Sequence, residues 1–245
     1  MKQIKQMYSN LNNKVAFFTG LYISVQTIVF TIILTVVKFS KSDAQGFAAN
    51  LLNLEPIFYF THHSNMFFGV ALLLFGWKDN EFYKRLLFSS VALMFFTILI
   101  YWAFIFDWTQ KNEREGEYLS KVWAWSHNVI THIIVPILSF VFLALYRKQI
   151  TITYKTFMWI NIYILSYVGF MLVVFLINFI ATKGQVVGYD FTDPFKPFGY
   201  KGGNIFLIIL LDILLVLLFV SSPSILIIAT KFSFNIKYQK LKTRY

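Results

Sequence analysis

The sequence predicts an all-α membrane protein built as a bundle of about six transmembrane helices. Of the 245 residues, 58% are hydrophobic and only 13% are charged, which is too apolar for a soluble domain with a hydrated surface. The hydrophobic residues form six long blocks, and most Lys and Arg residues fall between these blocks. We therefore expect residues 1–245 to form one multi-pass domain in the cell membrane.

Each block is long enough to cross a bilayer as a helix. A helix needs about 20 apolar residues to span a hydrocarbon core about 30 Å thick. In chain order, the expected spans are Val15–Val37, Ile57–Gly76, Leu86–Phe106, Val122–Tyr146, Phe157–Ala181 and Ile205–Thr230. The loops between them are short, which favours antiparallel packing of consecutive helices in one bundle.

The basic residues predict the orientation of the bundle. The N-terminal segment, the second and fourth loops and the C-terminal tail together hold 14 of the 22 Lys and Arg residues. Cytoplasmic loops carry the excess of Lys and Arg, so both termini are expected on the cytoplasmic side. Residues 231–245 form a basic tail that favours anionic lipid. The net charge of +11 thus reflects topology, and we expect no nucleic-acid partner.

Several kinds of site are excluded or disfavoured by composition. The chain has no Cys, which excludes disulfides, thiolate metal sites and Cys nucleophiles. The histidines form no H-x-x-H or H-x-x-x-H pair on a helix, which disfavours a metal site. No cofactor is therefore expected.

Polar residues of different helices converge in the outer half of the predicted bundle. Counting about 1.5 Å per residue from the outer helix ends, Thr61, Asn65 and His132 lie about 6, 12 and 15 Å deep, and Asp212 about 10 Å. Asn178 and all four histidines belong to the same layer. The inner halves of the helices are made of Leu, Ile, Val and Phe. The sequence thus predicts an outer-leaflet pocket lined by Thr61, Asn65, His132 and Asp212.

Helical spacing selects the residues that share a face. Thr61 and Asn65 are four residues apart, and Asn128 and His132 have the same spacing. His127 is turned from His132 by about 140°, so His132 is expected to face inward. Pro136 follows four residues later and cannot donate a hydrogen bond to the carbonyl of His132, which predicts a kink there.

Each of these residues also has a purely structural interpretation. A Thr in a membrane helix usually bonds its own backbone one turn earlier, so spacing alone favours a structural Thr61. An intramembrane His or Asp is costly and is functional by default, which favours His132 and Asp212 as site residues. His62 and His63 lie near the interface, and their roles and that of His127 stay open.

Three segments resemble one known family. Residues 58–65, Phe-Tyr-Phe-Thr-His-His-Ser-Asn, resemble the F-x-Y-F-T-x-Q-S-N segment of bacterial Pr6Pr membrane proteins, relatives of the androgen-induced gene 1 (AIG1/FAR-17a) family. Residues 131–136, Thr-His-Ile-Ile-Val-Pro, look like that group's H-x-x-x-P or H-x-x-x-x-P segment. The sequences at 193–195 and 199–200, Asp-Pro-Phe and Gly-Tyr, look like its Y-P-F-L-D…G-Y loop. His63 stands where the family has Gln.

The resemblance implies an activity. The eukaryotic members are threonine hydrolases that cleave esters between a fatty acid and a hydroxy fatty acid, using one Thr and one His in the membrane. By motif, these positions correspond to Thr61 and His132. A Thr hydroxyl needs a neighbouring base, and His132 is the candidate. Asn65, Asn128 or the backbone region freed by Pro136 would donate to the oxyanion. Asp212 would orient His132 as in a triad, or alternatively pair with another buried polar group.

The sequence therefore favours an intramembrane hydrolase, or an acyltransferase, whose partner is a membrane lipid carrying a fatty-acyl ester. Two alternatives stay open. Intramembrane His and Asp also mark ion and proton paths, so the chain is alternatively a channel, a transporter or a lipid-binding protein. Histidines on the second and fourth helices are alternatively ligands of a haem or a metal.

Overall fold

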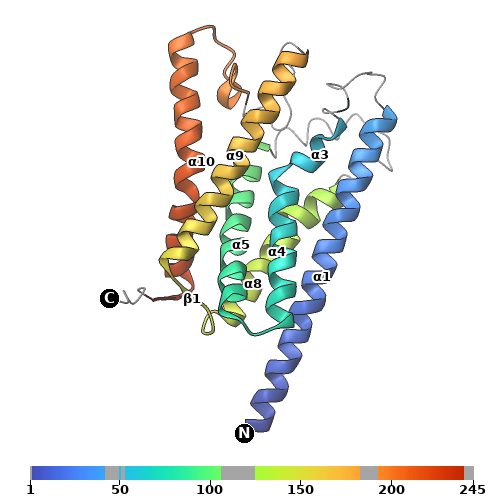
Figure 1. Cartoon of the computed structure of the whole chain (residues 1–245), viewed down its shortest axis with the longest axis vertical. Coiled ribbons are helices and arrows are strands. Elements are labelled where there is room, and N and C mark those ends of the chain that lie inside the picture. The colour runs from blue at the N-terminus through green and yellow to red at the C-terminus, as the bar shows by residue number, and fades with distance from the viewer. Residues whose placement is uncertain (1, 42–49, 51–52, 106–124, 183–192, 240–245) are drawn as a thin grey trace.

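A computed structural model of the chain describes residues 2–41, 50, 53–105, 125–182 and 193–239. This part is almost entirely helical (Figure 1). Its longer helices are α1 (Lys2–Lys41), α4 (Phe60–Trp77), α5 (Glu81–Ile100), α8 (Val135–Tyr146), α9 (Tyr154–Thr182) and α10 (Ile205–Ser233). The shorter elements are α3 (Glu55–Phe58), the π turns η1 (Tyr101–Ile105) and η2 (Ile130–Ile134), the 3-10 turn η4 (Pro197–Gly199), β1 (Thr151–Ile152) and β2 (Lys237–Tyr238). The predicted all-α membrane bundle is confirmed.

Five helices of the described chain are long and apolar enough to cross a membrane. They cover Asn13–Ser40, Glu81–Ala103, Trp125–Tyr146, Tyr154–Ile180 and Ile205–Ser233. The remaining predicted span corresponds to α4, whose 18 residues extend about 27 Å. It runs alongside the others in Figure 1, and its first turns carry the polar residues 61–65. The chain is therefore a multi-pass membrane protein in which one helix, α4, carries a run of polar residues in its first turns.

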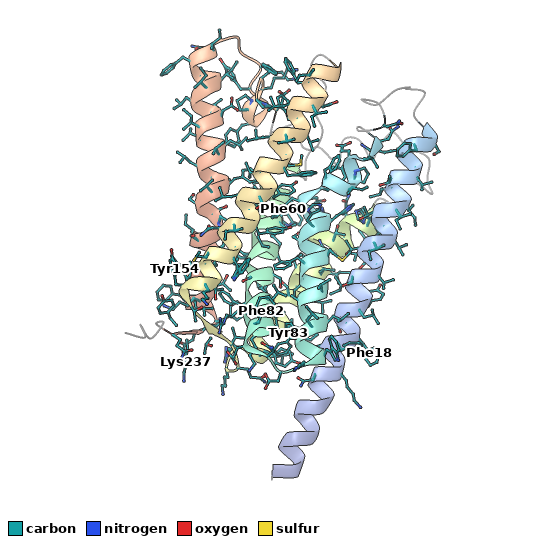
Figure 2. The ribbon with its side chains drawn as sticks, viewed as in Figure 1. Phe18, Phe60, Phe82, Tyr83, Tyr154 and Lys237 are labelled. Atoms are coloured by element: carbon teal, nitrogen blue, oxygen red, sulfur yellow. The ribbon has the colours of Figure 1, made fainter. Side chains whose placement is uncertain are left out.

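The centre of the bundle is formed by α4 and α5. Helix α4 packs against α1 and α5, and α5 also packs against α8, α9 and α10. Phe60, at the start of α4, lies in the middle of the bundle (Figure 2), where its ring centroid is 5.3 Å from that of Phe96 and 5.1 Å from that of Tyr167. Two thirds of the most apolar window of α5 is buried (67%), against 6% for α10. Helix α10 is thus peripheral, and the polar helix α4 is internal.

The helix boundaries differ from those predicted at several points. Helix α1 extends beyond Val15–Val37 at both ends, because hydropathy marks only the part that crosses lipid and a helix can continue into water. Residues 122–124 and Phe106, at the ends of two predicted spans, lie outside the described residues. The third span ends in the π turn η1, which hydropathy does not register.

The predicted basic tail has structure of its own. Residues 231–233 continue α10, and β2 pairs in parallel with β1, so that Thr151 opposes Lys237. Ile152 of β1 and Ile236, which precedes β2, are both buried. The start of α1 and the β1 segment lie at the same end of the bundle (Figure 1). Both termini facing the cytoplasm stays a prediction.

Glycines bring the backbones of α1 and α4 into contact. A Cβ added at Gly20 would lie 2.6 Å from the Gly69 carbonyl oxygen, and one at Gly69 would lie 2.6 Å from Ser24 Oγ. At Gly76 an added Cβ would lie 2.6 Å from the carbonyl oxygen of Asn13. Small residues spaced in this way let membrane helices approach closely, where packing rather than water drives association. The contact fixes α4 against α1 along most of its length.

A single methyl group in this contact should therefore destabilise the fold. Gly20→Ala and Gly69→Ala are expected to lower the melting temperature in detergent, because the clash is with backbone or with a packed hydroxyl. Gly169→Ala in α9 is the matched control, since an added Cβ there meets nothing within 4 Å and Ala is the better helix former. Equal melting temperatures for Gly20→Ala and Gly169→Ala would contradict the close contact.

Candidate functional site

A break between two helices places Thr61. Helix α3 ends at Phe58, Tyr59 is extended with φ −62° and ψ 124°, and α4 begins at Phe60. The Phe58 carbonyl, which the break leaves outside regular helix, accepts a hydrogen bond of 2.7 Å from Tyr167 Oη on α9. Thr61 thus sits in the first turn of α4, and its side chain is buried, with 6% exposed.

A ladder of hydrogen bonds fixes the backbone around Thr61. Ser64 Oγ donates to the Thr61 carbonyl (3.0 Å), and Thr97 Oγ1 of α5 donates to Ser64 Oγ (2.7 Å). Asn65 Nδ2 donates to the Thr61 carbonyl (2.7 Å) and to the Thr131 carbonyl (3.3 Å). One amide therefore joins the helix turn of Thr61 to the residue that precedes His132.

The helix that carries His132 is irregular where the sequence predicted a kink. Residues 125–129 are α-helical, η2 follows at Ile130–Ile134, and the Val135 N–H bonds to the Ile130 carbonyl, five residues back. Pro136 lies in the first turn of α8. The missing N–H of Pro136 is thus accommodated by a π turn, a feature that recurs at functional sites.

His132 is held by a second π turn. Its ring stacks on Tyr101 of η1, with centroids 3.6 Å apart and an interplanar angle of 13°. His132 is 6% exposed, and its Nδ1 has no hydrogen-bond partner within the described part of the chain. The side chain is therefore fixed in direction, and one of its buried ring nitrogens has no partner among the residues that the structure describes.

The structure brings most of the predicted site residues together and leaves one apart. Thr61, Asn65 and His132 belong to one buried layer between α4, α5 and the 125–146 helix, and Asn128 lies one turn before His132, half-buried. Asp212 is half-buried on the peripheral helix α10. Because Nδ1 of His132 has no hydrogen-bond partner among the described residues, Asp212 does not orient it, and the contact that orients the ring is the stack on Tyr101.

Thr97 and Tyr101 belong to the same layer but were not predicted. They are four residues apart near the outer end of the predicted third span and share a helix face. That spacing was the available signal. A comparison of depths that starts from the outer ends of the second, fourth and sixth spans does not include residues of the third.

A second polar cluster joins His62 to His127. His62 Nδ1 lies 2.7 Å from the Pro56 carbonyl oxygen and 3.1 Å from Thr31 Oγ1, and His62 Nε2 lies 3.1 Å from His127 Nε2. A ring nitrogen bonded to a carbonyl must carry the hydrogen, so His62 Nε2 is an acceptor and His127 Nε2 its donor. The side chain of His127 is buried, as that of His132 is, and its ring packs edge-on against Phe30.

The same pair bears on the haem and metal alternatives. At 3.1 Å the two Nε2 atoms are at hydrogen-bond distance, and the described residues hold no group of three or more His, Cys, Asp or Glu that could bind a metal ion. His63 points elsewhere, with Nε2 2.7 Å from the Ile57 carbonyl oxygen. The observed arrangement is a hydrogen-bonded histidine pair.

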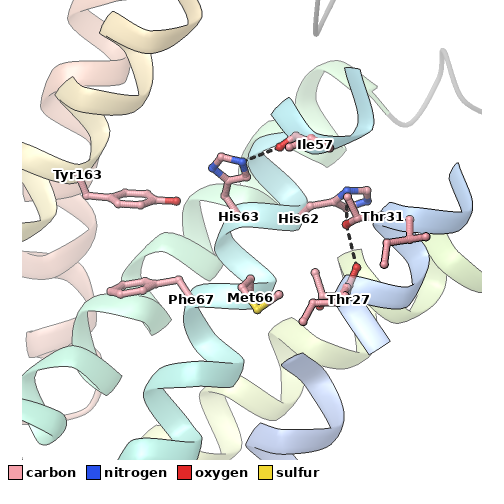
Figure 3. A pocket seen from close by; sticks show the side chains of 10 residues that line it. Thr27, Thr31, Ile57, His62, His63, Met66, Phe67 and Tyr163 are labelled. Atoms are coloured by element: carbon pink, nitrogen blue, oxygen red, sulfur yellow. Dashed lines mark hydrogen bonds between the residues drawn. The ribbon is translucent and has the colours of Figure 1, made fainter. Parts of the chain in front are cut away.

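An open groove of about 520 Å³ lies beside the second cluster, between α1, α4 and α9 (Figure 3). It is lined by Thr27, Ile28, Thr31, Ile32, Ile57, His62, His63, Met66, Phe67 and Tyr163. The four residues predicted to line a pocket are not among them. Thr61 and Asn65 instead face the inside of the bundle, on another side of α4.

The ladder from α5 to Thr61 is testable by a double-mutant cycle on Ser64→Ala and Thr97→Val. Hydrogen bonds between membrane helices average about 0.6 kcal/mol in such cycles, so we expect a coupling energy of about that size in detergent unfolding. The double variant should lose less stability than the sum of the single variants. Strictly additive losses would show that the two hydroxyls do not interact.

Comparison of the chain with family models, with curated proteins and with solved structures finds no match. The resemblance of residues 58–65, 131–136 and 193–200 to the Pr6Pr group therefore stays a prediction. What the site can do has to be argued from its own geometry.

Proposed function

We propose that this chain is an intramembrane hydrolase, or acyltransferase, of the cell membrane that acts on lipid esters through Thr61 and His132. The observation that carries the proposal is the amide of Asn65, which bonds the Thr61 carbonyl and the Thr131 carbonyl at once. It ties the candidate nucleophile's helix turn to the segment that carries the candidate base.

In this proposal His132 acts as the general base. Its Nδ1 is buried and unpaired among the described residues, which suits a nitrogen that accepts a proton. As Thr61 Oγ1 attacks the ester carbonyl carbon, its proton moves to His132. The C–O bond of the ester then breaks, the alcohol leaves with that proton, and an acyl-threonine remains. Water, or a second alcohol in the acyltransferase case, attacks the acyl group and restores Thr61.

The supporting residues take different roles. Both N–H groups of Asn65 are used by backbone carbonyls, so Asn65 is a positioning residue. This leaves Asn128 as the amide that the proposal assigns to the oxyanion, a contribution of about 3–4 kcal/mol where one has been measured. Tyr101 replaces Asp212 in orienting the imidazole.

The channel alternative is less well supported by the arrangement of polar groups. Beyond Asn65 the described part of α4 is apolar and packs against α1 through Gly69 and Gly76. A conducting path needs polar groups or water along the whole thickness of the membrane. Buried hydroxyls elsewhere in the described chain, such as Ser90 and Ser139, bond carbonyls of their own helices. The layer around Thr61 and His132 is therefore not continued by a polar path along α4, which suits a reaction on a lipid better.

The catalytic proposal predicts covalent labelling of Thr61. A fluorophosphonate probe should label the purified protein at Thr61, and Thr61→Ala and His132→Ala should each lower lipid-ester turnover by more than about a thousandfold, because a nucleophile and its base act as a unit. Thr61→Ser should keep partial labelling. Thr35→Ala is the matched control, since the Thr35 hydroxyl bonds only its own helix.

Melting curves must first show that the variants fold. Labelling that persists in Thr61→Ala, or that maps to another residue, would refute the assignment of the nucleophile. Well-folded wild-type protein with neither labelling nor turnover would return the chain to the non-enzymatic alternatives.

A further inference from the structure

The groove between α1, α4 and α9 opens sideways toward lipid. Ile28 and Ile32 of α1 form one wall and are 45% and 56% exposed. Tyr163 of α9 forms the other, and Met66 and Phe67 of α4 lie between them (Figure 3). Both walls belong to helices long and apolar enough to cross a membrane. The open side therefore faces hydrocarbon, and the matching occupant of its apolar length is an acyl chain.

One end of the groove carries two polar groups with unused bonding capacity. His63 Nε2 lies 2.7 Å from the Ile57 carbonyl oxygen, so this nitrogen carries the hydrogen and Nδ1 of the neutral ring is an acceptor. Within the described chain His63 Nδ1 and Tyr163 Oη make no hydrogen bond. In Figure 3 the hydroxyl end of Tyr163 is directed toward His63. This end thus offers one acceptor and one donor side by side.

The depth of these groups places them in the outer half of the predicted bundle. Counted like Thr61 from the outer end of the predicted span, His63 lies about 9 Å along the helix, within the outer leaflet. Met66 and Phe67 lie one turn deeper. A lipid seated here would place its ester near His63 and Tyr163, with a chain running inward over Met66.

We infer that the groove binds diacylglycerol, which has a free hydroxyl next to an ester. The hydroxyl donates to His63 Nδ1, Tyr163 Oη donates to the ester carbonyl, and one acyl chain fills the space between Ile28 and Phe67. A triacylglycerol or a carboxylate has no hydroxyl to donate to His63. The site differs from the proposed catalytic layer, because His63 is turned about 160° from Thr61 around α4, and binding requires no turnover.

Photocrosslinking tests where the acyl chain binds. Thr61→Ala protein in nanodiscs is irradiated with a diacylglycerol that carries a diazirine in its chain, and labelled peptides are mapped by mass spectrometry. We expect labelling on the groove faces of α1 and α4. Met66→Trp, which fills the floor, and Ile28→Trp, which fills the wall from another helix, should each reduce it at least fivefold. Leu172→Trp is the control, since Leu172 is 49% exposed on α9 and does not line the groove.

Competition tests the polar end. Diacylglycerol should displace the probe about fivefold more effectively than its O-methyl ether, which is the effect of about one hydrogen bond. This preference should vanish in His63→Leu. Labelling that survives both Trp variants, or an ether that competes as well as the alcohol, would overturn the inference. Because the assay uses Thr61→Ala protein, either result is independent of the proposed catalysis.

Discussion

The fold depends on burying the polar start of α4 inside a bilayer-spanning bundle. Hydrocarbon offers no hydrogen bonds, so a polar helix turn that faced lipid at that depth would be left unsatisfied. Thr61, Ser64 and Asn65 are all at most 6% exposed. Glycine contacts with α1 on one side and the Thr97 hydroxyl on the other enclose the helix. A more apolar helix could stand at the periphery, as α10 does, but α4 cannot.

Local irregularity gives the candidate site its shape. The extended residue Tyr59 starts α4 at the level of the polar layer, and the π turns η1 and η2 bring the Tyr101 and His132 rings into a stack. Each irregularity exposes backbone groups that regular helix would satisfy, and nearby side chains bond some of them. Tyr167 bonds the Phe58 carbonyl, and Asn65 bonds the Thr131 carbonyl. The breaks leave backbone carbonyls without helical partners, and side chains of the polar cluster stabilise the breaks by bonding these carbonyls.

The amino-acid pattern predicted the helices well because hydropathy responds directly to the bilayer. It also predicted one layer for Thr61, Asn65 and His132, since depth follows from helical rise. It did not predict the approach of α1 to α4. A glycine in a helix does not by itself indicate whether another helix packs against it. Asp212 was assigned to the site from depth, and depth says nothing of which helices are neighbours. The His62–His127 bond depends on how two helices are rotated about their axes. A π turn changes that rotation, and hydropathy does not register a π turn.

The central claim is that Thr61 and His132 lie in one buried layer inside the bundle, joined through Asn65, while Asp212 stays apart. The absence of Cys from the natural chain allows a direct measurement with introduced cysteine pairs. The Thr61→Cys, His132→Cys protein and the Thr61→Cys, Asp212→Cys protein are treated in membranes with a short bifunctional thiol reagent, and intramolecular cross-links are identified by mass spectrometry. The structure predicts cross-linking of the first pair and not of the second. Efficient cross-linking of the Asp212 pair, with none for the His132 pair, would contradict it.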